Sequence, residues 1–352
     1  MAANPLKLLY RADGGHPIGT GHIWRAARIL RALAERVDLD ARLLFAEDPF
    51  ARNVAESAPA RAIVLPPRTD LSAVKPLLLA GPVLAELERE PADLVVVDML
   101  DTPDADMRAI RETGVRLVTF DDRGPGRQFA DAIINILVEE PRPESLPQST
   151  RLLEGGDYVV LDPVFEDIQT RLPAREFGPL RRVFVAMGGA DAAGLSVKVA
   201  RALRLIRELD EVQFVCGPAF PHVEELRRAV DGAPWRSELL TSLPGLLDRY
   251  LRADLSIVAG GLTMYEVCCV GAPSLAVCQP IDHQLELADR LSTAGAMATV
   301  GYGLLASEEQ IAEALRQLAD PRIRRAMSAR GPALVDGKGT GRVADALIAV
   351  AG

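Results

Sequence analysis

Two of the four histidines, His16 and His22, lie in one glycine-rich stretch near the amino terminus, 11-RADGGHPIGTGHIWRAARILRAL-33. Its glycines at 14, 15, 19 and 21 leave the backbone free to turn, and a helical pattern begins near residue 22. The positive end of a helix dipole disfavours the imidazolium form of a histidine at the helix start. We therefore expect His22 to carry a neutral ring that can take a proton, which is the role of a general base.

Two further residues of this loop have polar side chains with more than one interpretation. His16 lies in the looser part of the loop, where it either contacts a ligand or, as we favour, is solvated. Asp13 could accept backbone N–H groups of the loop or hold a histidine in orientation, and the first role is the commoner one. We take His22 and Asp13 as the candidate catalytic residues.

Carboxylates also end two predicted strands, in 98-DMLD-101 and 120-FDD-122. They could line a cleft, but no third group has a fixed place beside them, as a metal site would require. We expect neither a metal nor another cofactor.

Three glycine loops, at 14–23, 187–194 and 259–267, each follow a predicted strand and open a predicted helix. Ligands of open α/β sheets bind beyond the carboxyl ends of the strands, where such loops lie. One loop alone would be read as a tight turn, but three at equivalent positions favour a ligand cleft between two halves. The absence of G-x-x-x-x-G-K-[ST] and of an in-register G-x-G-x-x-G excludes a P-loop and a dinucleotide fingerprint.

Glu266 lies five residues after Gly261, on the first turns of a predicted helix. Its carboxylate could accept both hydroxyls of a ribose whose diphosphate lies on the N–H groups of Gly261 and Leu262. Alternatively, it is a plain acidic residue near a helix start, with a dipole interaction of ~0.3–1 kcal/mol. The spacing leaves both interpretations open.

Short apolar runs alternate with amphipathic stretches along both halves of the chain. Strands are expected at 6–10, 41–46, 61–66, 93–99, 115–122 and 131–138, and again at 181–189, 211–217, 253–261 and 273–279. Helices are expected near 22–36, 73–90, 104–114, 193–208, 221–230 and 262–271. This alternation predicts the α/β class, with parallel sheets covered by helices on both faces.

The alternation of strands and helices breaks off between about residues 140 and 180, which are rich in proline and charged residues. This composition predicts a linker and a crossing between domains. A chain of 352 residues suits two domains. We expect an N-terminal Rossmann-like domain at 1–165, a linker at 166–180 and a C-terminal Rossmann-like domain at 181–335. A last helix over 336–352 could pack back on the first half.

The composition excludes several classes of protein. With 49% apolar residues and a net charge of −9, the chain has ordered cores and is no general nucleic-acid binder, although a small anionic ligand remains compatible. The four cysteines form no C-x-x-C pair and read as buried, reduced thiols. There is neither a signal-type apolar run nor a window of ~18 apolar residues. We expect a cytoplasmic monomer or weak dimer without a membrane span.

Longer stretches resemble a known family. The stretch 11-RADGGHPIGTGHIWRA-26 resembles the I-G-x-G-H-x-x-R loop of the UDP-sugar hydrolases of pseudaminic acid biosynthesis and their spore-coat polysaccharide relatives. Residues 94–124 and 130–138 resemble the second half of that family's N-terminal domain, and 185–203 and 253–291 resemble its C-terminal domain. The last stretch is also similar to the UDP-GlcNAc transferase of peptidoglycan synthesis. The likeness extends to about residue 300.

The resemblance implies a GT-B fold, with two Rossmann-like domains whose parallel sheets face a central cleft that holds a UDP-sugar. It implies that the C-terminal half holds UDP, with the diphosphate at Gly260 and Gly261 and the ribose at Glu266. The histidine of the loop motif, which falls on His22, is the catalytic base in those hydrolases. The remaining expected substrate contacts are Gly19, Gly21, Arg25, Asp98, Asn135, Gly188, Gly189, Gly217, Leu262, Thr263 and Gln284.

The chain departs from the hydrolase pattern at one motif. The hydrolases have Asp-His-Tyr-Gly where this sequence has 98-DMLD-101, so Asp98 is kept while Met99 and Leu100 replace the histidine and tyrosine. His283 also replaces a common asparagine. Our first hypothesis is a UDP-sugar hydrolase of bacterial surface-glycan or nonulosonic acid biosynthesis. The alternatives are a GT-B glycosyltransferase and a nucleotide-sugar-binding protein that has lost catalysis.

Overall fold

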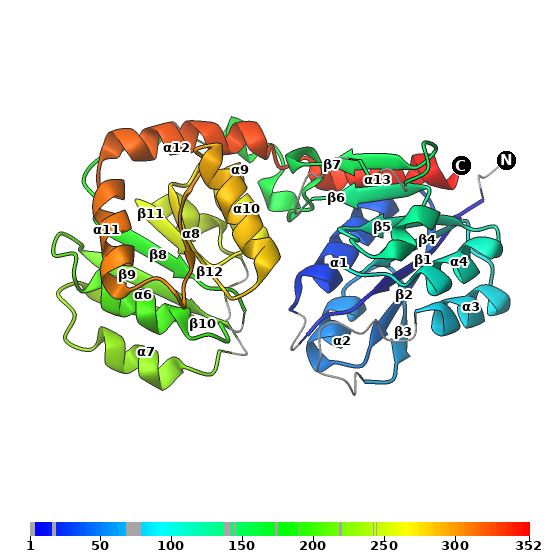
Figure 1. The fold of residues 1–352 in the computed structure, drawn as a ribbon, viewed down its shortest axis with the longest axis horizontal. Helices are drawn as coiled ribbons and strands as arrows, with labels where there is room; N and C mark the ends of the chain where they lie inside the picture. Colours follow the sequence, from blue (N-terminus) through cyan, green and yellow to red (C-terminus); the bar gives the residue numbers. More distant parts are fainter. Residues whose placement is uncertain are drawn as a thin grey trace. The chain divides into compact units, whose positions relative to one another are not determined.

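The chain forms two compact units (Figure 1). The computed structural model describes residues 4–15, 19–67, 79–136, 142–143, 146–172, 175–189, 191–217, 220–241, 243 and 245–352. The N-terminal unit comprises Met1–Pro163 together with Lys338–Gly352, and the C-terminal unit comprises Val164–Gly337. The segment 166–180, expected to be a linker, is therefore part of the C-terminal unit.

A seven-stranded parallel sheet of strand order β3-β2-β1-β4-β5-β6-β7 runs through the N-terminal unit. Its strands are β1 (Leu6–Ala12), β2 (Leu39–Ala46), β3 (Arg61–Leu65), β4 (Leu94–Asp98), β5 (Arg116–Phe120), β6 (Ala132–Asn135) and β7 (Arg151–Glu154). The strand order reverses between β1 and β4, which are paired so that Ala12 lies opposite Asp98. Such a reversal is where an open α/β sheet binds ligands at its carboxyl edge.

Helices cover this sheet on both faces, which explains why Leu8, Leu9 and Tyr10 of β1 are all fully buried. They are α1 (Gly21–Ala34), α2 (Pro49–Glu56), α3 (Ala80–Arg89), α4 (Asp104–Glu112) and α13 (Gly339–Ala351), with short 3-10 turns η1 (Pro125–Phe129) and η2 (Gly156–Tyr158). The last of these helices, α13, packs against α1 and η2 within the N-terminal unit. The carboxyl-terminal segment of the chain thereby completes the N-terminal core.

The C-terminal unit repeats the plan with a six-stranded parallel sheet of order β10-β9-β8-β11-β12-β13. Its strands are β8 (Arg182–Ala186), β9 (Glu211–Cys216), β10 (Arg236–Thr241), β11 (Leu255–Val258), β12 (Ser274–Cys278) and β13 (Ala298–Tyr302). Its α-helices are α5 (Ile168–Arg171), α6 (Leu195–Leu203), α7 (Val223–Val230), α8 (Leu247–Arg252), α9 (Leu262–Cys269), α10 (Asp282–Thr293), α11 (Glu308–Leu318) and α12 (Pro321–Leu334), and the 3-10 turn η3 (Pro163–Phe165) lies where the two units join in sequence. Here the strand order reverses between β8 and β11.

The predicted α/β class with parallel sheets is confirmed, and three strands went unpredicted. β7 lies inside the stretch read as a linker, where it pairs with β6. β7, β10 and β13 lie at sheet edges, and the side chains of β10 are largely exposed, so these segments lack the buried apolar run that marked the other strands.

No helix in the part of the chain that the structure describes combines the length and the apolar content that crossing a membrane requires.

Candidate functional site

The glycine loop after β1 delivers His22 to the first turn of α1, beside the point where the N-terminal strand order reverses. Gly15 and Gly19 exchange two backbone hydrogen bonds of 2.9 and 2.8 Å, which close the loop into a narrow turn. Both have a positive φ, +105° and +87°, a conformation that glycine adopts without strain. A Cβ at Gly15 would also lie 2.2 Å from the Asp48 carboxylate. His16 lies outside the described residues.

His22 forms a hydrogen bond with Asp98 at the end of β4, with 2.6 Å between Nδ1 and Oδ1. Burial by itself would raise the pKa of Asp98, but the charge of Arg25 and the hydrogen bonds from Arg25 and His22 outweigh it and lower that pKa. Asp98 is therefore an ionised carboxylate that can only accept, so Nδ1 of His22 must carry the proton. This tautomer leaves the lone pair on Nε2, which is the arrangement that a general base needs.

Asp98 is itself held in place by two further side chains. Arg25 donates to both carboxylate oxygens, with its Nε 2.8 Å from Oδ2, and the Tyr10 hydroxyl donates to Oδ2 at 3.1 Å. The remaining terminal nitrogen of Arg25 donates to Asp121 at 2.6 Å. Burial would lower the pKa of Arg25, but the two carboxylates raise it, so the guanidinium stays charged.

Arg25 is 5% exposed and its guanidinium binds two carboxylates. The resemblance implies that it contacts substrate, which stays a prediction, and the structure shows that it fixes Asp98. The pairing is bidentate at Asp98, which sets the orientation of that carboxylate as well as its position. Its cation also lies 4.8 Å from the centre of the Phe120 ring.

Asp121 connects this cluster to the end of β6, where Asn135 lies. Its Oδ1 accepts the backbone N–H of Ile136 at 2.7 Å, while Oδ2 binds Arg25. Asn135 is 9% exposed and donates to Glu154 at 3.1 Å. The expected residues His22, Arg25 and Asp98 thus lie in one cluster, with Asn135 bound to it through the neighbouring backbone.

Asp13, an expected catalytic residue, lies directly after β1. Its carboxylate binds the guanidinium of the buried Arg11 at 2.5 and 2.8 Å, and it accepts the N–H of Ala46 at 2.8 Å. These bonds join the end of β1 to the end of β2. The carboxylate that hydrogen-bonds His22 is Asp98, so Asp98 becomes a further candidate partner of the base, and a catalytic role of Asp13 stays a prediction. Sequence reasoning placed Asp98 only as a substrate contact.

In the C-terminal unit, three glycine loops follow β8, β9 and β11 at the carboxyl edge of the sheet. They hold Gly188 and Gly189, then Gly217, then Gly260 and Gly261. A Cβ at Gly217 would lie 2.0 Å from the carbonyl oxygen of Gly189, so these two loops are in direct contact and position 217 needs glycine. The loop glycines therefore lie around the reversal of strand order between β8 and β11, where nucleotide ligands bind in such folds.

The two helices that begin at this reversal differ in how their N-termini are satisfied. Asp191 accepts the N–H groups of Leu195 and Ser196 at 2.8 Å each, so a carboxylate of the protein already occupies the start of α6. No side chain among the described residues caps α9, which begins after Gly261. The N–H groups at the start of α9 are thus available to an anion.

Gln284 on α10 lies against the start of α9. A Cβ on Gly260 would meet its Oε1 at 2.2 Å, so the Gln284 side chain packs directly on the Gly260 backbone. The Oε1 atom is buried and has no hydrogen-bond partner among the residues that the structure describes. A buried polar atom without a partner is costly, which points to a ligand or water at this place. Thr263 donates to the carbonyl of Gly260 at 3.0 Å and braces the same turn.

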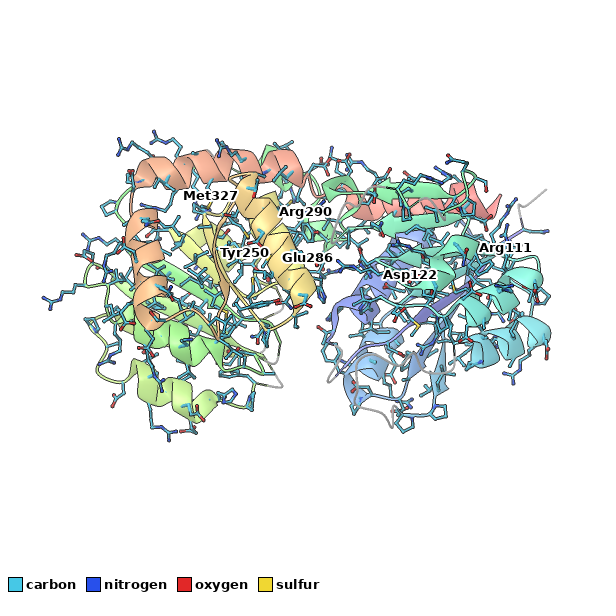
Figure 2. All side chains as sticks on the ribbon, in the orientation of Figure 1. Arg111, Asp122, Tyr250, Glu286, Arg290 and Met327 are labelled. Carbon is cyan, nitrogen blue, oxygen red and sulfur yellow. The ribbon has the colours of Figure 1, made fainter. Side chains whose placement is uncertain are left out.

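Glu266 lies one turn further along α9 and accepts a hydrogen bond from Tyr250 of α8, with 2.9 Å between Oη and Oε2. Tyr250 is fully buried and is labelled inside the C-terminal unit in Figure 2. Burial and the charge of Glu266 raise the pKa of Tyr250, so the phenol keeps its proton and donates. Gly260, Gly261, Leu262, Thr263, Glu266 and Gln284, all expected substrate contacts, therefore lie around the start of α9.

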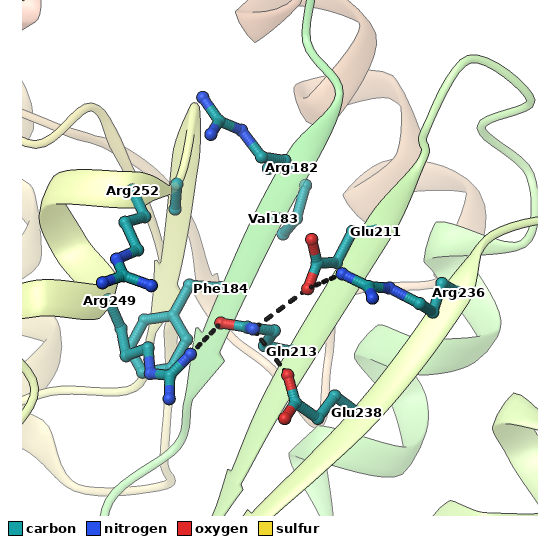
Figure 3. A pocket seen from close by; sticks show the side chains of 10 residues that line it. Arg182, Val183, Phe184, Glu211, Gln213, Arg236, Glu238, Arg249 and Arg252 are labelled. Carbon is teal, nitrogen blue, oxygen red and sulfur yellow. Dashed lines mark hydrogen bonds and ion pairs between the residues drawn. The ribbon is translucent and has the colours of Figure 1, made fainter.

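A cavity of about 370 Å³ lies at the opposite end of the strands (Figure 3). Arg182, Glu211 and Arg236, which begin β8, β9 and β10, line it. Arg236 pairs with Glu211 at 2.8 Å, and Gln213 donates to Glu238 at 2.6 Å. It lies at the amino ends of the strands, remote from the glycine loops, so we assign it no ligand.

The four cysteines are buried and free, and burial raises the pKa of Cys268 and Cys269 to about 12. No group of three or more His, Cys, Asp or Glu residues in the described ranges could hold a metal ion.

Comparison with known proteins found relatives along the whole chain, although no family model matches it. The spore coat polysaccharide biosynthesis protein SpsG of Bacillus subtilis (strain 168) is 30% identical over 340 residues, which cover 94% of this chain and 95% of that protein. A UDP-N-acetylglucosamine--N-acetylmuramyl-(pentapeptide) pyrophosphoryl-undecaprenol N-acetylglucosamine transferase of Thiobacillus denitrificans is 35% identical over 198 residues, 54% of this chain and 53% of that one.

Among solved structures, MurG of Acinetobacter baumannii is similar with a TM-score of 0.73 and 17% identity, covering 98% of this chain and 100% of that one. This likeness extends over both units and agrees with the two parallel sheets. The expected GT-B fold, built from two Rossmann-like units, is confirmed.

Proposed function

The chain belongs to the family of the spore coat polysaccharide biosynthesis protein SpsG, and from that membership we propose that it hydrolyses a UDP-sugar to UDP and the free sugar. We propose a UDP-linked amino or deoxy sugar as substrate and bacterial surface-glycan or nonulosonic acid biosynthesis as the setting. The similarity to the UDP-sugar hydrolases of pseudaminic acid biosynthesis supports this choice. The observation that carries the proposal is the 2.6 Å hydrogen bond between His22 and an ionised Asp98.

The C-terminal unit binds the nucleotide in this proposal. The uncapped N-terminus of α9 receives the diphosphate on the N–H groups of Gly261 and Leu262, and Glu266 accepts the ribose hydroxyls. The buried Oε1 of Gln284, which lacks a partner in the described structure, accepts a hydroxyl or N–H group of the sugar. The closed N-terminus of α6 supports α9, and not the Gly188–Gly189 loop, as the diphosphate site.

The N-terminal unit supplies the base. Nε2 of His22 takes a proton from water as the water oxygen attacks the anomeric carbon. The bond from that carbon to the β-phosphate oxygen breaks, and UDP leaves with the electron pair. The α9 N-terminus stabilises the charge that develops on UDP, and Asp98 stabilises the imidazolium until its proton passes to solvent.

A glycosyltransferase on the same fold is the second candidate, in which an acceptor hydroxyl replaces water. The peptidoglycan N-acetylglucosamine transferase that is 35% identical to 54% of the chain favours it. The pairing of His22 with Asp98 serves either reaction, because both begin with the removal of a proton from a hydroxyl group.

Incubation with a set of UDP-sugars in water enriched in heavy oxygen separates these reactions. Hydrolysis at the anomeric carbon places the heavy oxygen in the free sugar, as mass spectrometry of the products would reveal. Heavy oxygen in UDP would mean attack at phosphorus and would contradict the proposal. Turnover that occurs only with an added acceptor, without label in the sugar, would establish the transferase.

The nucleotide itself is tested by calorimetry with UDP, ADP, GDP and CMP. We expect UDP to bind most tightly, because the α9 loop resembles UDP-sugar sites. ADP binding as tight as UDP binding would contradict a UDP-specific site.

A further inference from the structure

We propose that Tyr250 is a positioning residue for ribose recognition, holding the Glu266 carboxylate in the rotation that accepts the ribose hydroxyls. The inference rests on the proposed UDP site and adds a residue that touches no ligand. Its basis is the hydrogen bond between the Tyr250 hydroxyl and Oε2 of Glu266, which joins α8 to α9 at 2.9 Å.

The Tyr250 ring is fixed by its own surroundings. It is fully buried, and it packs edge-to-face on Phe184 of β8, with ring centres 5.6 Å apart and an interplanar angle of 74°. Its backbone carbonyl accepts a hydrogen bond of 3.2 Å from Arg175. Backbone and ring are both held, so the direction in which the hydroxyl donates is set by the core of the unit.

Glu266 needs such support because its side chain is only partly buried and has three rotatable torsions. A carboxylate that accepts two neighbouring hydroxyls must turn both oxygens toward them, and ordering a glutamate side chain on binding costs conformational entropy. The Tyr250 bond to Oε2 orders that side chain before the nucleotide arrives. Because burial keeps the phenol protonated, the bond persists at the pH at which the carboxylate is ionised.

The test compares UDP with 2′,3′-dideoxy-UDP by calorimetry on the full-length wild type and on Tyr250→Phe. The wild type should prefer UDP. The variant should lose about 2- to 13-fold in UDP affinity, because the Glu266 side chain must then be ordered on binding, while its affinity for dideoxy-UDP stays unchanged. A change confined to the ligand that has the ribose hydroxyls separates positioning from a general disturbance of the site.

Tyr302→Phe is the matched control, because the Tyr302 hydroxyl likewise donates to a carboxylate of the C-terminal unit, Asp282 at 2.6 Å, which has no part in the proposed nucleotide site. It should leave UDP affinity at the wild-type value. Thermal unfolding of both variants checks that each retains its fold.

A double-mutant cycle with Glu266→Ala gives the second readout. Glu266→Ala should weaken UDP binding by about 5- to 150-fold, and adding Tyr250→Phe to it should cause no further loss. The inference would be overturned if the losses of UDP affinity in the two single variants added up in the double variant. It would also be overturned if Tyr250→Phe lost as much affinity for dideoxy-UDP as for UDP, or kept its full affinity for UDP. If the wild type binds no UDP, the proposed function itself is contradicted. If the wild type binds UDP and dideoxy-UDP equally, only the proposed recognition of the ribose hydroxyls is contradicted.

Discussion

Asp98 is the residue on which the proposed chemistry depends, because it binds both His22 and Arg25 at the end of β4. His22 selects its tautomer through this carboxylate, and Arg25 keeps the carboxylate ionised where burial would otherwise favour its neutral form. The same arrangement explains why a charged residue such as Arg25 is buried, because its guanidinium pairs with carboxylates inside the protein.

His22→Asn should reduce turnover of the UDP-sugar by ~10²–10⁴-fold, because the proton acceptor is lost. UDP affinity should stay at the wild-type value, since the nucleotide is assigned to the C-terminal unit. Steady-state kinetics with calorimetry on the same sample measures both. Full turnover at saturating substrate together with lost UDP binding would contradict the assignment of His22 as base.

Asp98→Asn should also reduce turnover, because it changes the group that orients His22. An amide in place of the carboxylate no longer enforces the Nδ1–H tautomer, so the turnover number should fall by roughly the ~10²–10⁴-fold expected of His22→Asn. Combining the two substitutions should add little, because they disable one unit. Independent, multiplying effects on kcat would show that Asp98 acts elsewhere.

Arg25→Met should lower the free energy of unfolding by about 3–5 kcal/mol near neutral pH, because two buried carboxylates lose their cation. Arg108→Met, which removes a cation whose side chain is 58% exposed and 2.7 Å from Asp104, should cost less than about 1 kcal/mol. Urea unfolding of both variants provides the comparison.

The pH dependence of the Arg25→Met effect follows from the lowered pKa of Asp98. In the wild type, Asp98 stabilises the fold above its unfolded-state pKa, and this contribution is lost as the pH falls toward the folded-state value. Without Arg25, burial raises that pKa, so the ionised carboxylate destabilises the variant until it is protonated. The stability difference should therefore narrow as the pH is lowered toward about 4, the ordinary pKa of an aspartate, and a constant difference would contradict the charge argument.

At the scale of elements, the two helix starts of the C-terminal unit make opposite predictions. Gly261 has a φ of +70° and a ψ of −143° at the N-cap of α9, a conformation in which a Cβ is strained. Gly261→Ala should therefore displace the first N–H groups of α9 and weaken UDP binding by tenfold or more, about 1.4 kcal/mol. Calorimetry with UDP measures the loss.

Asp191→Ala is the matched test at α6. It removes the acceptor for the N–H groups of Leu195 and Ser196 and for the Gln279 amide, so it should cost about 1–2 kcal/mol of stability. UDP affinity should be unchanged. Tighter UDP binding by Asp191→Ala would mean that the diphosphate uses α6, and would move the site to the Gly188–Gly189 loop.

At the scale of the whole molecule, the end of the chain stabilises its beginning. Leu347 of α13 is fully buried in the N-terminal unit, where α13 packs against α1. Leu347→Ala should lower the stability of this unit by about 2–5 kcal/mol, while Leu334→Ala, at a side chain that is 38% exposed, should have little effect. Thermal unfolding measures both, and equal effects would contradict a core role for α13.

The sequence by itself determined the features that local patterns encode. Alternating strands and helices predicted the parallel α/β class, because buried strands and helix starts leave their signals in consecutive residues. The glycine loops and the place of His22 at a helix start were predicted for the same reason. The family resemblance predicted Gly260, Gly261 and Glu266 as nucleotide contacts. The edge strands β7, β10 and β13 were missed, since an edge strand does not require the continuous apolar run of a buried one.

Only the tertiary structure decided which distant side chains meet. Asp98 lies 76 residues from His22, yet it is the partner because β4 lies beside β1 in the sheet, whereas the nearby Asp13 is bound to Arg11. In the same way, the packing of α8 against β8 brings Tyr250 to Glu266. Strand order and helix packing are set by the burial of the whole core, so the partner of a catalytic side chain cannot be read from residue spacing alone.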